Sequence, residues 1–376
     1  MEYDVIIVGA RVTGAILGTL LGGLGHRVLI LEKADFPSDT LSTAFFRSPT
    51  LYMLERIGVL EKVKESATPM TEIWDYMDGH ILQTPVEEER EHLRFFLCVR
   101  RVTFDWILYK RLMREPNVEI RLNAKVQDVI WEDGQVAGVR WKDQHGKHEA
   151  TSRVVVGADG FYSTVAKLLD PPFENYFPVQ RFMYYVFYSG LDLLGPAVNE
   201  HHFAGNSLAY VFPTDGNLVM AALSLPIAEF AGFKKTPLKS FTSHLESLPM
   251  LAPRLSKAEM VSELYGSGNI PCYQRHPFGP GWALVGDAQQ VLDPWSGMGM
   301  DHGSTHAGML ANALNDFLNG DAQCETAMKE YHIKIRTWSE KSYHRTTTFA
   351  ADVRPMVRSA LIKRGLIMPD RLEYAI

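Results

Sequence analysis

Residues 5–32 of the 376-residue chain read VIIVGARVTGAILGTLLGGLGHRVLILE, and this stretch decides the fold. Residues 5–8 are apolar and largely β-branched, which is typical of a strand buried in a parallel sheet. Residues 12–24 predict a helix, and residues 27–32 predict a second strand after the break at Gly25. A strand, a tight turn, a helix and a strand over this length predict one βαβ unit of an α/β fold.

The turn GARVTG, residues 9–14, has the pattern of a dinucleotide-binding turn. Backbone N–H groups in such a turn approach a pyrophosphate, and the positive end of the helix attracts the anion. We expect Gly9 to permit the turn and Gly14 to permit close packing of the helix. Arg11 replaces the middle glycine of the usual motif, so its side chain should swing outward, toward phosphate or a neighbouring carbonyl.

Glu32 ends the second strand, at the distance where an acidic residue accepts hydrogen bonds from ribose hydroxyls. Together with the turn, it predicts a dinucleotide site. The other interpretation is an ordinary βαβ unit with a glycine-rich turn.

The rest of the chain predicts a cofactor domain interrupted by a sheet. We expect helices at 51–64, 104–114 and 238–245, strands at 118–122 and 282–285, a β-meander over 124–131, 135–141 and 148–156, and a hairpin around 213–216. The predicted cofactor domain comprises 1–75, 95–172 and 266–330. The inserted sheet domain comprises 76–94 and 173–265, and a helical C-terminal segment comprises 331–376.

The composition is that of an ordinary globular protein, with 46% hydrophobic and 22% charged residues and a net charge of −6. No basic block predicts a nucleic-acid partner. Cys98, Cys272 and Cys324 are too few and too widely spaced for a disulfide framework or a zinc site, which favours the cytoplasm. We expect no signal peptide and no transmembrane segment.

Two more motifs follow predicted strands. GADGFYS lies at 157–163, and GDA at 286–288 precedes DPWSGMGM at 293–300. A carboxylate after a strand suits hydrogen bonding to ribityl hydroxyls. Residues 297–300 can present N–H groups and a helix N-terminus to an electron-rich ring edge.

These stretches resemble the group A FAD-dependent monooxygenases, the p-hydroxybenzoate hydroxylase-like superfamily, in a branch shared with geranylgeranyl-reductase-like proteins. The resemblance covers residues 1–170 and 265–320. It implies a Rossmann-like, doubly wound FAD-binding domain with a β-meander, and an inserted β-sheet substrate domain. The implied FAD contacts are Gly9, Arg11, Val12, Thr13, Gly14, Glu32, Lys33, Arg101 (in RVTFD, 101–105), Val126, Asp159, Gly160, Asp287, Gly297, Met298, Gly299 and Met300.

The resemblance also implies a reaction. NAD(P)H would reduce FAD, and a flavin C4a-hydroperoxide would hydroxylate or epoxidise a small apolar or aromatic molecule, with Asp293, Pro294 and Arg47 near the flavin. The alternative is a flavin-dependent C=C reductase or dehydrogenase of geranylgeranyl-reductase type. A halogenase is disfavoured because no W-x-W-x-I-P segment occurs, and a non-catalytic flavoprotein stays open. A homodimer or a separate flavin reductase is a possible partner.

The segment from 173 to 267 carries many aromatic residues, which either line an apolar substrate pocket or fill the core of a two-sided sheet. They are Tyr176, Phe177, Phe182, Tyr184, Tyr185, Phe187, Tyr188, Phe203, Tyr210 and Phe212. We predict no metal site. His302 and His306 would share a helix face but lack further ligands, and His201 and His202 would point to opposite faces of a strand.

Overall fold

The opening segment forms the predicted βαβ unit. In the computed structural model, which describes residues 2–368, β1 (Tyr3–Val8), α1 (Val12–Gly23) and β2 (Val28–Leu31) follow one another in this order. β1 pairs in parallel with β2 on one side and with β10 (Gly146–Gly157) on the other. The first strand is therefore central in its sheet, which explains its unbroken apolar sequence.

This first sheet has the path β19-β20-β10-β1-β2-β7. Its other strands are β7 (Val118–Arg121), β19 (Phe278–Gly279) and β20 (Trp282–Leu284). The predicted meander is present as β8 (Lys125–Glu132), β9 (Gln135–Asp143) and β10. The first half of β10 pairs antiparallel with β9, and its second half pairs parallel with β1, so one long strand joins the meander to the sheet.

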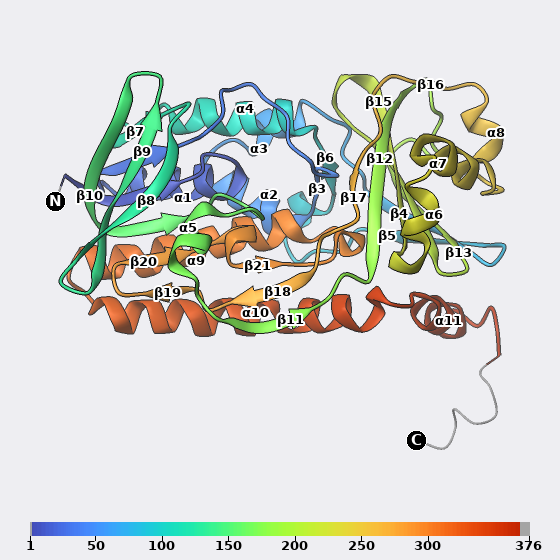
Figure 1. The fold of residues 1–376 in the computed structure, drawn as a ribbon. Coiled ribbons are helices and arrows are strands. Elements are labelled where there is room, and N and C mark those ends of the chain that lie inside the picture. The colour runs from blue at the N-terminus through green and yellow to red at the C-terminus, as the bar shows by residue number, and fades with distance from the viewer. Residues whose placement is uncertain (1, 369–376) are drawn as a thin grey trace, which may run out of the picture.

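Alternate residues of β1 face two separate cores. Val5 and Ile7 pack against the helices of one face, whereas Ile6 and Val8 pack against the meander. The helices of the first face include α1, α4 (Arg101–Leu112) and α9 (Gly299–Leu318), and α5 (Thr164–Leu169) lies on the meander side (Figure 1).

The predicted helix at 51–64 is wrong in one respect. The structure has two helices there, α2 (Ser48–Arg56) and α3 (Leu60–Lys64), because Gly58 at φ +72° ends the first. A positive φ cannot continue a right-handed helix. The short strands β3 (Phe45–Phe46) and β6 (Leu97–Cys98), which pair with each other, were not predicted.

The second sheet has the path β16-β12-β15-β14-β13-β4-β5, and β17 pairs with β12. Its strands are β4 (Glu72–Met77), β5 (His80–Pro85), β12 (Arg181–Ser189), β13 (Val198–Ala204), β14 (Ser207–Pro213), β15 (Leu218–Pro226), β16 (Glu259–Met260) and β17 (Tyr265–Ser267). The predicted hairpin is β14–β15. β4 enters this sheet at residue 72, before the boundary expected at 76. The division into a cofactor and a substrate domain stays a prediction.

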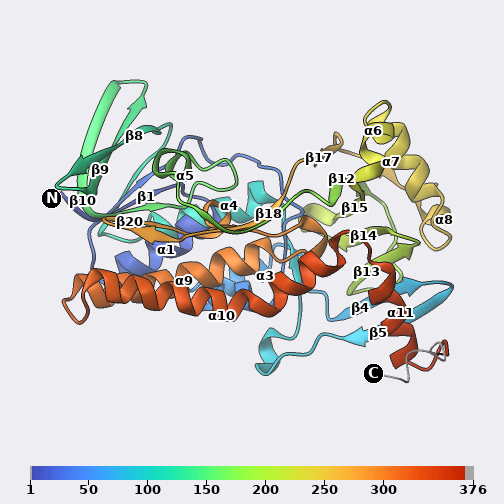
Figure 2. The ribbon, with the colours of Figure 1, turned by 60° about the horizontal axis from the view of Figure 1, so that its bottom comes forward.

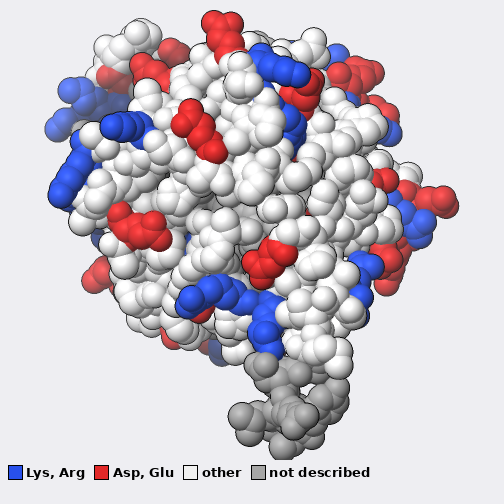
Figure 3. All heavy atoms as spheres, turned by 90° about the vertical axis from the view of Figure 1, so that its right-hand side faces the viewer, with Lys and Arg blue, Asp and Glu red and all other residues white. Residues whose placement is uncertain are grey.

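The outer face of the second sheet is covered by α6 (Phe230–Phe233), α7 (Pro237–Glu246) and α8 (Ala252–Leu255). Figure 3 views the molecule from this end and shows charged side chains of both signs scattered among one another. A small third sheet, β11 (Phe173–Phe177), β18 (Cys272–Arg275) and β21 (Gln290–Val291), lies between the two larger ones (Figure 1).

The C-terminal part of the described chain is helical, as predicted. α10 (Cys324–Ala350) runs beside α9 along the first lobe and continues toward α11 (Arg354–Lys363) on the second (Figure 2). The Tyr331 hydroxyl donates to the Leu284 carbonyl at 3.0 Å, and the Trp295 indole donates to the Thr346 carbonyl at 3.2 Å, so α10 contacts both the sheet and the 293–300 loop. Among residues 2–368, no helix is both long enough and apolar enough to cross a bilayer.

One buried carboxylate links the lobes. Asp215, in the β14–β15 turn, accepts hydrogen bonds from the backbone and guanidinium of Arg100 and from Thr103, at the start of α4. Burial opposes ionisation of this carboxyl, but these hydrogen bonds outweigh it and lower the pKa of Asp215. The second lobe is thus attached directly beside Arg101.

Candidate cofactor site

The two glycines of the first turn are required by packing. Gly9 has φ +104°, and a Cβ there would lie 2.5 Å from the Ala158 carbonyl oxygen. A Cβ on Gly14 would lie 1.9 Å from the Gly9 carbonyl oxygen. Any side chain at these positions would push α1 away from the strand ends, so the structure agrees with the packing roles predicted from the sequence.

The N-terminus of α1 has free hydrogen-bond donors. The first helical bond runs from Ala15 N–H to Arg11 O, and the N–H groups of Val12, Thr13 and Gly14 make no backbone hydrogen bond within residues 2–368. The first turn has no acidic residue and no side-chain cap. These donors and the positive end of the helix dipole make the turn suitable for a phosphate anion.

Two arginines converge on one buried carboxylate beside this turn. Asp105, which is fully buried on α4, accepts 2.9 and 3.0 Å hydrogen bonds from Arg101 and a 2.6 Å bond from Arg11. Arg11 also donates to the carbonyls of Ser38 and Asp39, so its side chain swings outward to neighbouring carbonyls, one of the two outcomes expected. The cluster keeps a net positive charge, which favours an anionic ligand.

Glu32 is buried at the end of β2. One carboxylate oxygen accepts from the Ala10 N–H at 2.8 Å, and the other accepts from the Ala34 N–H at 3.0 Å. The carboxylate is thereby fixed beside the turn with lone pairs to spare for a ribose. Lys33 is exposed next to it, whereas the Val126 side chain is buried in the meander core and cannot contact a ligand.

The two later aspartates differ in their surroundings. Asp159 caps α5, since its carboxylate accepts from the Ser163 hydroxyl and from the Thr164 and Val165 N–H groups. Asp287 has an exposed side chain, yet surrounding protein raises its pKa to about 6, and Arg101 partly opposes this shift. An exposed carboxylate can accept a hydrogen bond from a ligand hydroxyl. Gly160, at φ +80°, follows Asp159 and permits the chain to turn.

The 293–300 loop is held by both lobes. Arg47 donates from its guanidinium to the Ser296 carbonyl at 2.7 Å, and the Tyr210 hydroxyl of β14 donates to the Trp295 carbonyl. Gly297 has φ +61°, and Gly299 begins α9. The N–H groups of Met298, Gly299 and Met300 make no backbone hydrogen bond among the described residues, so they remain available to a ring edge.

Asp301 is a site residue that sequence reasoning missed. Its Oδ1 accepts from the Arg47 N–H at 3.0 Å and from the Thr50 hydroxyl at 2.8 Å. Within the described chain its buried Oδ2 has no hydrogen bond, and Arg47 Nη1 lies 3.9 Å away. Burial raises the pKa of Asp301, and the Arg47 charge opposes that shift. In the sequence, Asp301 is recognisable only as an acidic residue in the first turn of a helix. An exposed residue that stabilises the helix N-terminus would give the same pattern.

Asp293 and Pro294 lie at the start of this loop. Asp293 is buried, and its carboxylate caps the turn by accepting from the Trp295 N–H at 3.1 Å. Burial raises the pKa of Asp293 to about 7, against the opposing effects of that N–H and of Arg181. The direct roles near the flavin assigned to Asp293, Pro294 and Arg47 stay predictions.

The histidines follow the sequence-based expectations. His302 hydrogen-bonds Gln290 and, at 2.9 Å, Ser342, while His306 hydrogen-bonds Ser339 at 3.0 Å, so both rings serve the contact of α9 with α10. Burial lowers the pKa of His302 to about 3. His201 and His202 do lie on opposite faces of β13: His201 pairs with Asp75, and His202 pairs with Glu200.

The aromatic residues divide among three places. One set faces the first lobe and packs with Phe45, Phe96 and Trp295: Tyr185, Phe187, Phe203, Tyr210 and Phe212. Phe182, Tyr184 and Tyr188 belong to the opposite core, and Tyr176 and Phe177 are exposed on β11. Half of the predicted residues therefore lie on the face toward the 293–300 loop.

A family model described as FAD binding domain matches residues 2–208, more than half of the chain. The chain belongs to the FAD-binding domain family. It is an FAD-dependent oxidoreductase of the group A flavoprotein monooxygenase superfamily, as the motifs predicted. The free donors on α1, the Arg11–Asp105–Arg101 cluster and the exposed Asp287 fit the pyrophosphate and hydroxyls of FAD.

Several named proteins resemble this flavoprotein. Digeranylgeranylglycerophospholipid reductase 2 of Methanopyrus kandleri is 24% identical over 91% of this chain and 83% of its own. Para-nitrophenol 4-monooxygenase of a Pseudomonas strain is 23% identical over 88% of this chain and 82% of its own. The structure of the myxobacterial chondrochloren halogenase CndH matches with a TM-score of 0.84 at 19% identity, covering 99% of this chain and 92% of that one. At 19% identity, the similarity to CndH shows a shared fold.

We predict that Arg101→Gln weakens FAD binding about tenfold or more, because it removes a positive charge from the cluster that we expect to lie beside the pyrophosphate; tenfold corresponds to roughly 1.4 kcal/mol. Titration of apoprotein with FAD, followed by flavin fluorescence, measures this change. Arg140→Gln on the exposed meander is the matched control and should bind like the wild type. Equal affinity of the two variants would contradict the assigned position of the pyrophosphate.

We predict that Asp293→Asn stabilises the protein more at pH 8.5 than at pH 5. The folded-state pKa of about 7 lies above the ordinary value of 3.8, so the wild type loses stability as the pH rises through this interval. The amide avoids that loss and can still accept from the Trp295 N–H. Thermal unfolding at both pH values tests this, and a stability difference that does not change with pH would show that Asp293 titrates normally.

Proposed function

We propose that this flavoprotein is an NAD(P)H-dependent monooxygenase that hydroxylates or epoxidises a small apolar or aromatic molecule. The observation that carries the proposal is the aromatic face of the second sheet, which lies toward the 293–300 loop. Bound FAD would accept a hydride from the nicotinamide and activate molecular oxygen. The protein's task is then to hold the substrate, orient it and exclude water.

The aromatic face suits that task. Tyr185, Phe187 and Phe212 of the second lobe are buried on this face, and Phe45 of the first lobe packs with them, its ring stacked on Phe212 at a centroid distance of 4.8 Å. Aromatic walls favour a flat apolar ligand and keep water from the reacting atoms. Arg47 and Tyr210 fix the loop carbonyls from opposite sides, so the loop is positioned before a substrate enters.

A histidine–aspartate pair adds proton-transfer chemistry to this face. His201 Nδ1 lies 2.8 Å from Asp75 Oδ1, and the ring contacts Tyr210 at a centroid distance of 5.3 Å. His201 Nε2 has no hydrogen-bond partner among the described residues, and the two side chains are 21% and 22% exposed. With Nδ1–H donated to Asp75, Nε2 is the acceptor. We propose that it takes the proton of a weakly acidic substrate hydroxyl.

The second candidate is a flavin-dependent C=C reductase. The similarity to a digeranylgeranylglycerophospholipid reductase over 91% of this chain favours it. Such a reaction adds two hydrogens to an alkene and consumes no oxygen, so the product distinguishes the two functions. We also propose a cytoplasmic location, consistent with three free cysteines, and either a homodimer or a separate flavin reductase as partner.

We predict that the FAD-loaded protein oxidises NADH or NADPH and consumes oxygen faster when a phenol is added. A suitable phenol is 4-nitrophenol, which appears in the name of one relative. The product should carry one added oxygen atom, measured by mass spectrometry after reaction under ¹⁸O₂. An oxygen electrode records the uptake, and heat-denatured protein is the control. A product that gains two hydrogens under anaerobic conditions would replace this proposal with the reductase.

We predict that His201→Asn slows phenol-stimulated oxygen uptake about 10²–10⁴-fold, the usual contribution of a positioned general base. His148→Asn is the matched control, because His148 lies 2.9 Å from the Asp143 carboxylate on the meander, away from the aromatic face. Oxygen uptake by His201→Asn at the wild-type rate would remove His201 from the proposed mechanism.

A further inference from the structure

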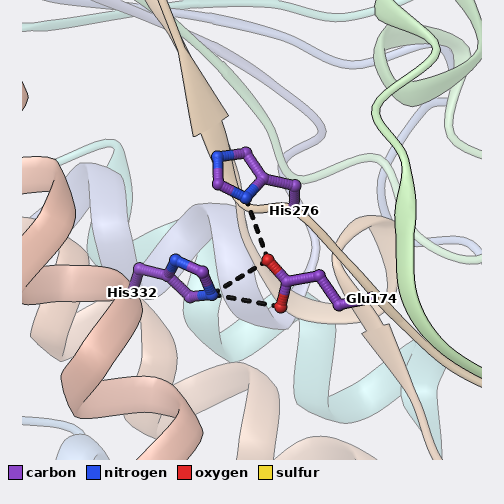
Figure 4. A group of neighbouring side chains, drawn as sticks. All are labelled: Glu174, His276 and His332. Carbon is purple, nitrogen blue, oxygen red and sulfur yellow. Dashed lines mark hydrogen bonds and ion pairs between the residues drawn. The ribbon is translucent and has the colours of Figure 1, made fainter.

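Three potential metal ligands meet at the junction between the lobes, outside the cofactor site. Glu174 lies on β11, His276 follows β18, and His332 lies on α10 (Figure 4). One ligand atom from each residue lies within 4.8 Å of the others. These positions are 56 residues or more apart in sequence, so no local pattern could have predicted their meeting, and three separate elements supply the side chains.

Both imidazoles approach the Glu174 carboxylate. Glu174 Oε1 lies 2.9 Å from His276 Nδ1 and 3.0 Å from His332 Nε2. In a tetrahedral zinc site with bonds of about 2.0–2.1 Å, ligand atoms are roughly 3.3 Å apart. For an ion to bind all three atoms, the two carboxylate–imidazole distances need to lengthen by a few tenths of an ångström. The imidazole nitrogens, which lie within 4.8 Å of each other, need to reach about the same separation.

The second carboxylate oxygen, Oε2, lies 3.1 Å from His332 Nε2 and is also bound by Arg336. Arg336 Nε donates to Glu174 Oε2 at 2.8 Å, and Arg336 Nη2 lies 2.6 Å from the same oxygen. The Nη2 atom also donates to the Arg275 carbonyl at 2.8 Å. Ligating carboxylates are commonly held by such outer hydrogen bonds, which orient the free oxygen toward the ion. Arg336 also adds a positive charge beside the three ligands, which weakens the binding of a cation without removing a ligand atom.

We propose that Glu174, His276 and His332 bind a Zn²⁺ ion through Oε1, Nδ1 and Nε2. Two imidazoles and a carboxylate form a donor set that zinc accepts, and the partial exposure of all three side chains leaves the fourth position to water.

The ion would tie α10 to the small sheet that connects the two lobes. The backbone N–H of His276 donates to the Pro172 carbonyl at 2.9 Å. The backbone of one ligand is therefore already fixed next to the start of β11. His332 is one turn of helix from Arg336 and close to Tyr331, which anchors α10 to Leu284. Zinc binding should therefore raise the unfolding temperature of the whole protein.

The test uses FAD-loaded protein that has been treated with a chelator and desalted. Titration with ZnCl₂ in a calorimeter should give one zinc ion per chain, and CoCl₂ should give tetrahedral absorption bands at wavelengths longer than those of the flavin. His332→Ala and Glu174→Gln should each weaken zinc binding at least tenfold and abolish the rise in unfolding temperature. Arg336→Gln should bind zinc as tightly as the wild type or more tightly, since a like charge is removed.

His148→Ala serves as the control, because it removes a histidine from a two-residue His–Asp pair and should leave zinc binding unchanged. Wild-type binding no tighter than that of His332→Ala would overturn the proposal. Undiminished binding in both His332→Ala and Glu174→Gln would do the same. In either case the three residues and Arg336 form an ion-pair cluster that needs no metal.

Discussion

The structure of the cofactor site depends on one buried charge, the Asp105 carboxylate between Arg11 and Arg101. A fully buried carboxylate without partners is costly, and removing one partner of such a cluster typically costs about 3–5 kcal/mol. Asp105 therefore holds both guanidinium groups beside the N-terminus of α1. This explains how the chain tolerates arginine at the middle glycine position of its turn: the side chain is drawn away from the closest point of approach and adds positive charge at the edge of the site.

The second lobe is positioned by contacts that begin next to this cluster. Arg100, the neighbour of Arg101, binds Asp215 in the β14–β15 turn, and β14 also carries Tyr210, which binds the 293–300 loop. Arg47 holds the same loop from the first lobe. Short, buried polar contacts thus couple the first turn of α1 to the 293–300 loop. The aromatic face and the His201–Asp75 pair are placed against the loop by the same strands.

Much of the first lobe could be predicted from local sequence. The βαβ unit, the meander and the roles of Gly9 and Gly14 follow from apolar runs and turn glycines. Gly58 ends α2 through its backbone conformation, which apolar periodicity at 51–64 does not reveal. Asp301, Asp75 and the Glu174–His276–His332 cluster could not be predicted, because their partners are distant in sequence and each residue alone is an ordinary polar side chain. The aromatic residues left a substrate pocket and the core of a two-sided sheet both open, and only the strand register decides which of them face the first lobe.

The central claim is that the first turn binds a diphosphate. Comparison of FAD and FMN binding to the same apoprotein tests it most directly, because FMN has the flavin ring and one phosphate but lacks the adenosine half and the diphosphate. If α1, Glu32 and the Asp105 cluster act as described, FAD should bind about 100-fold more tightly than FMN, a difference of roughly 2.8 kcal/mol. Equal affinities for the two flavins would contradict the account.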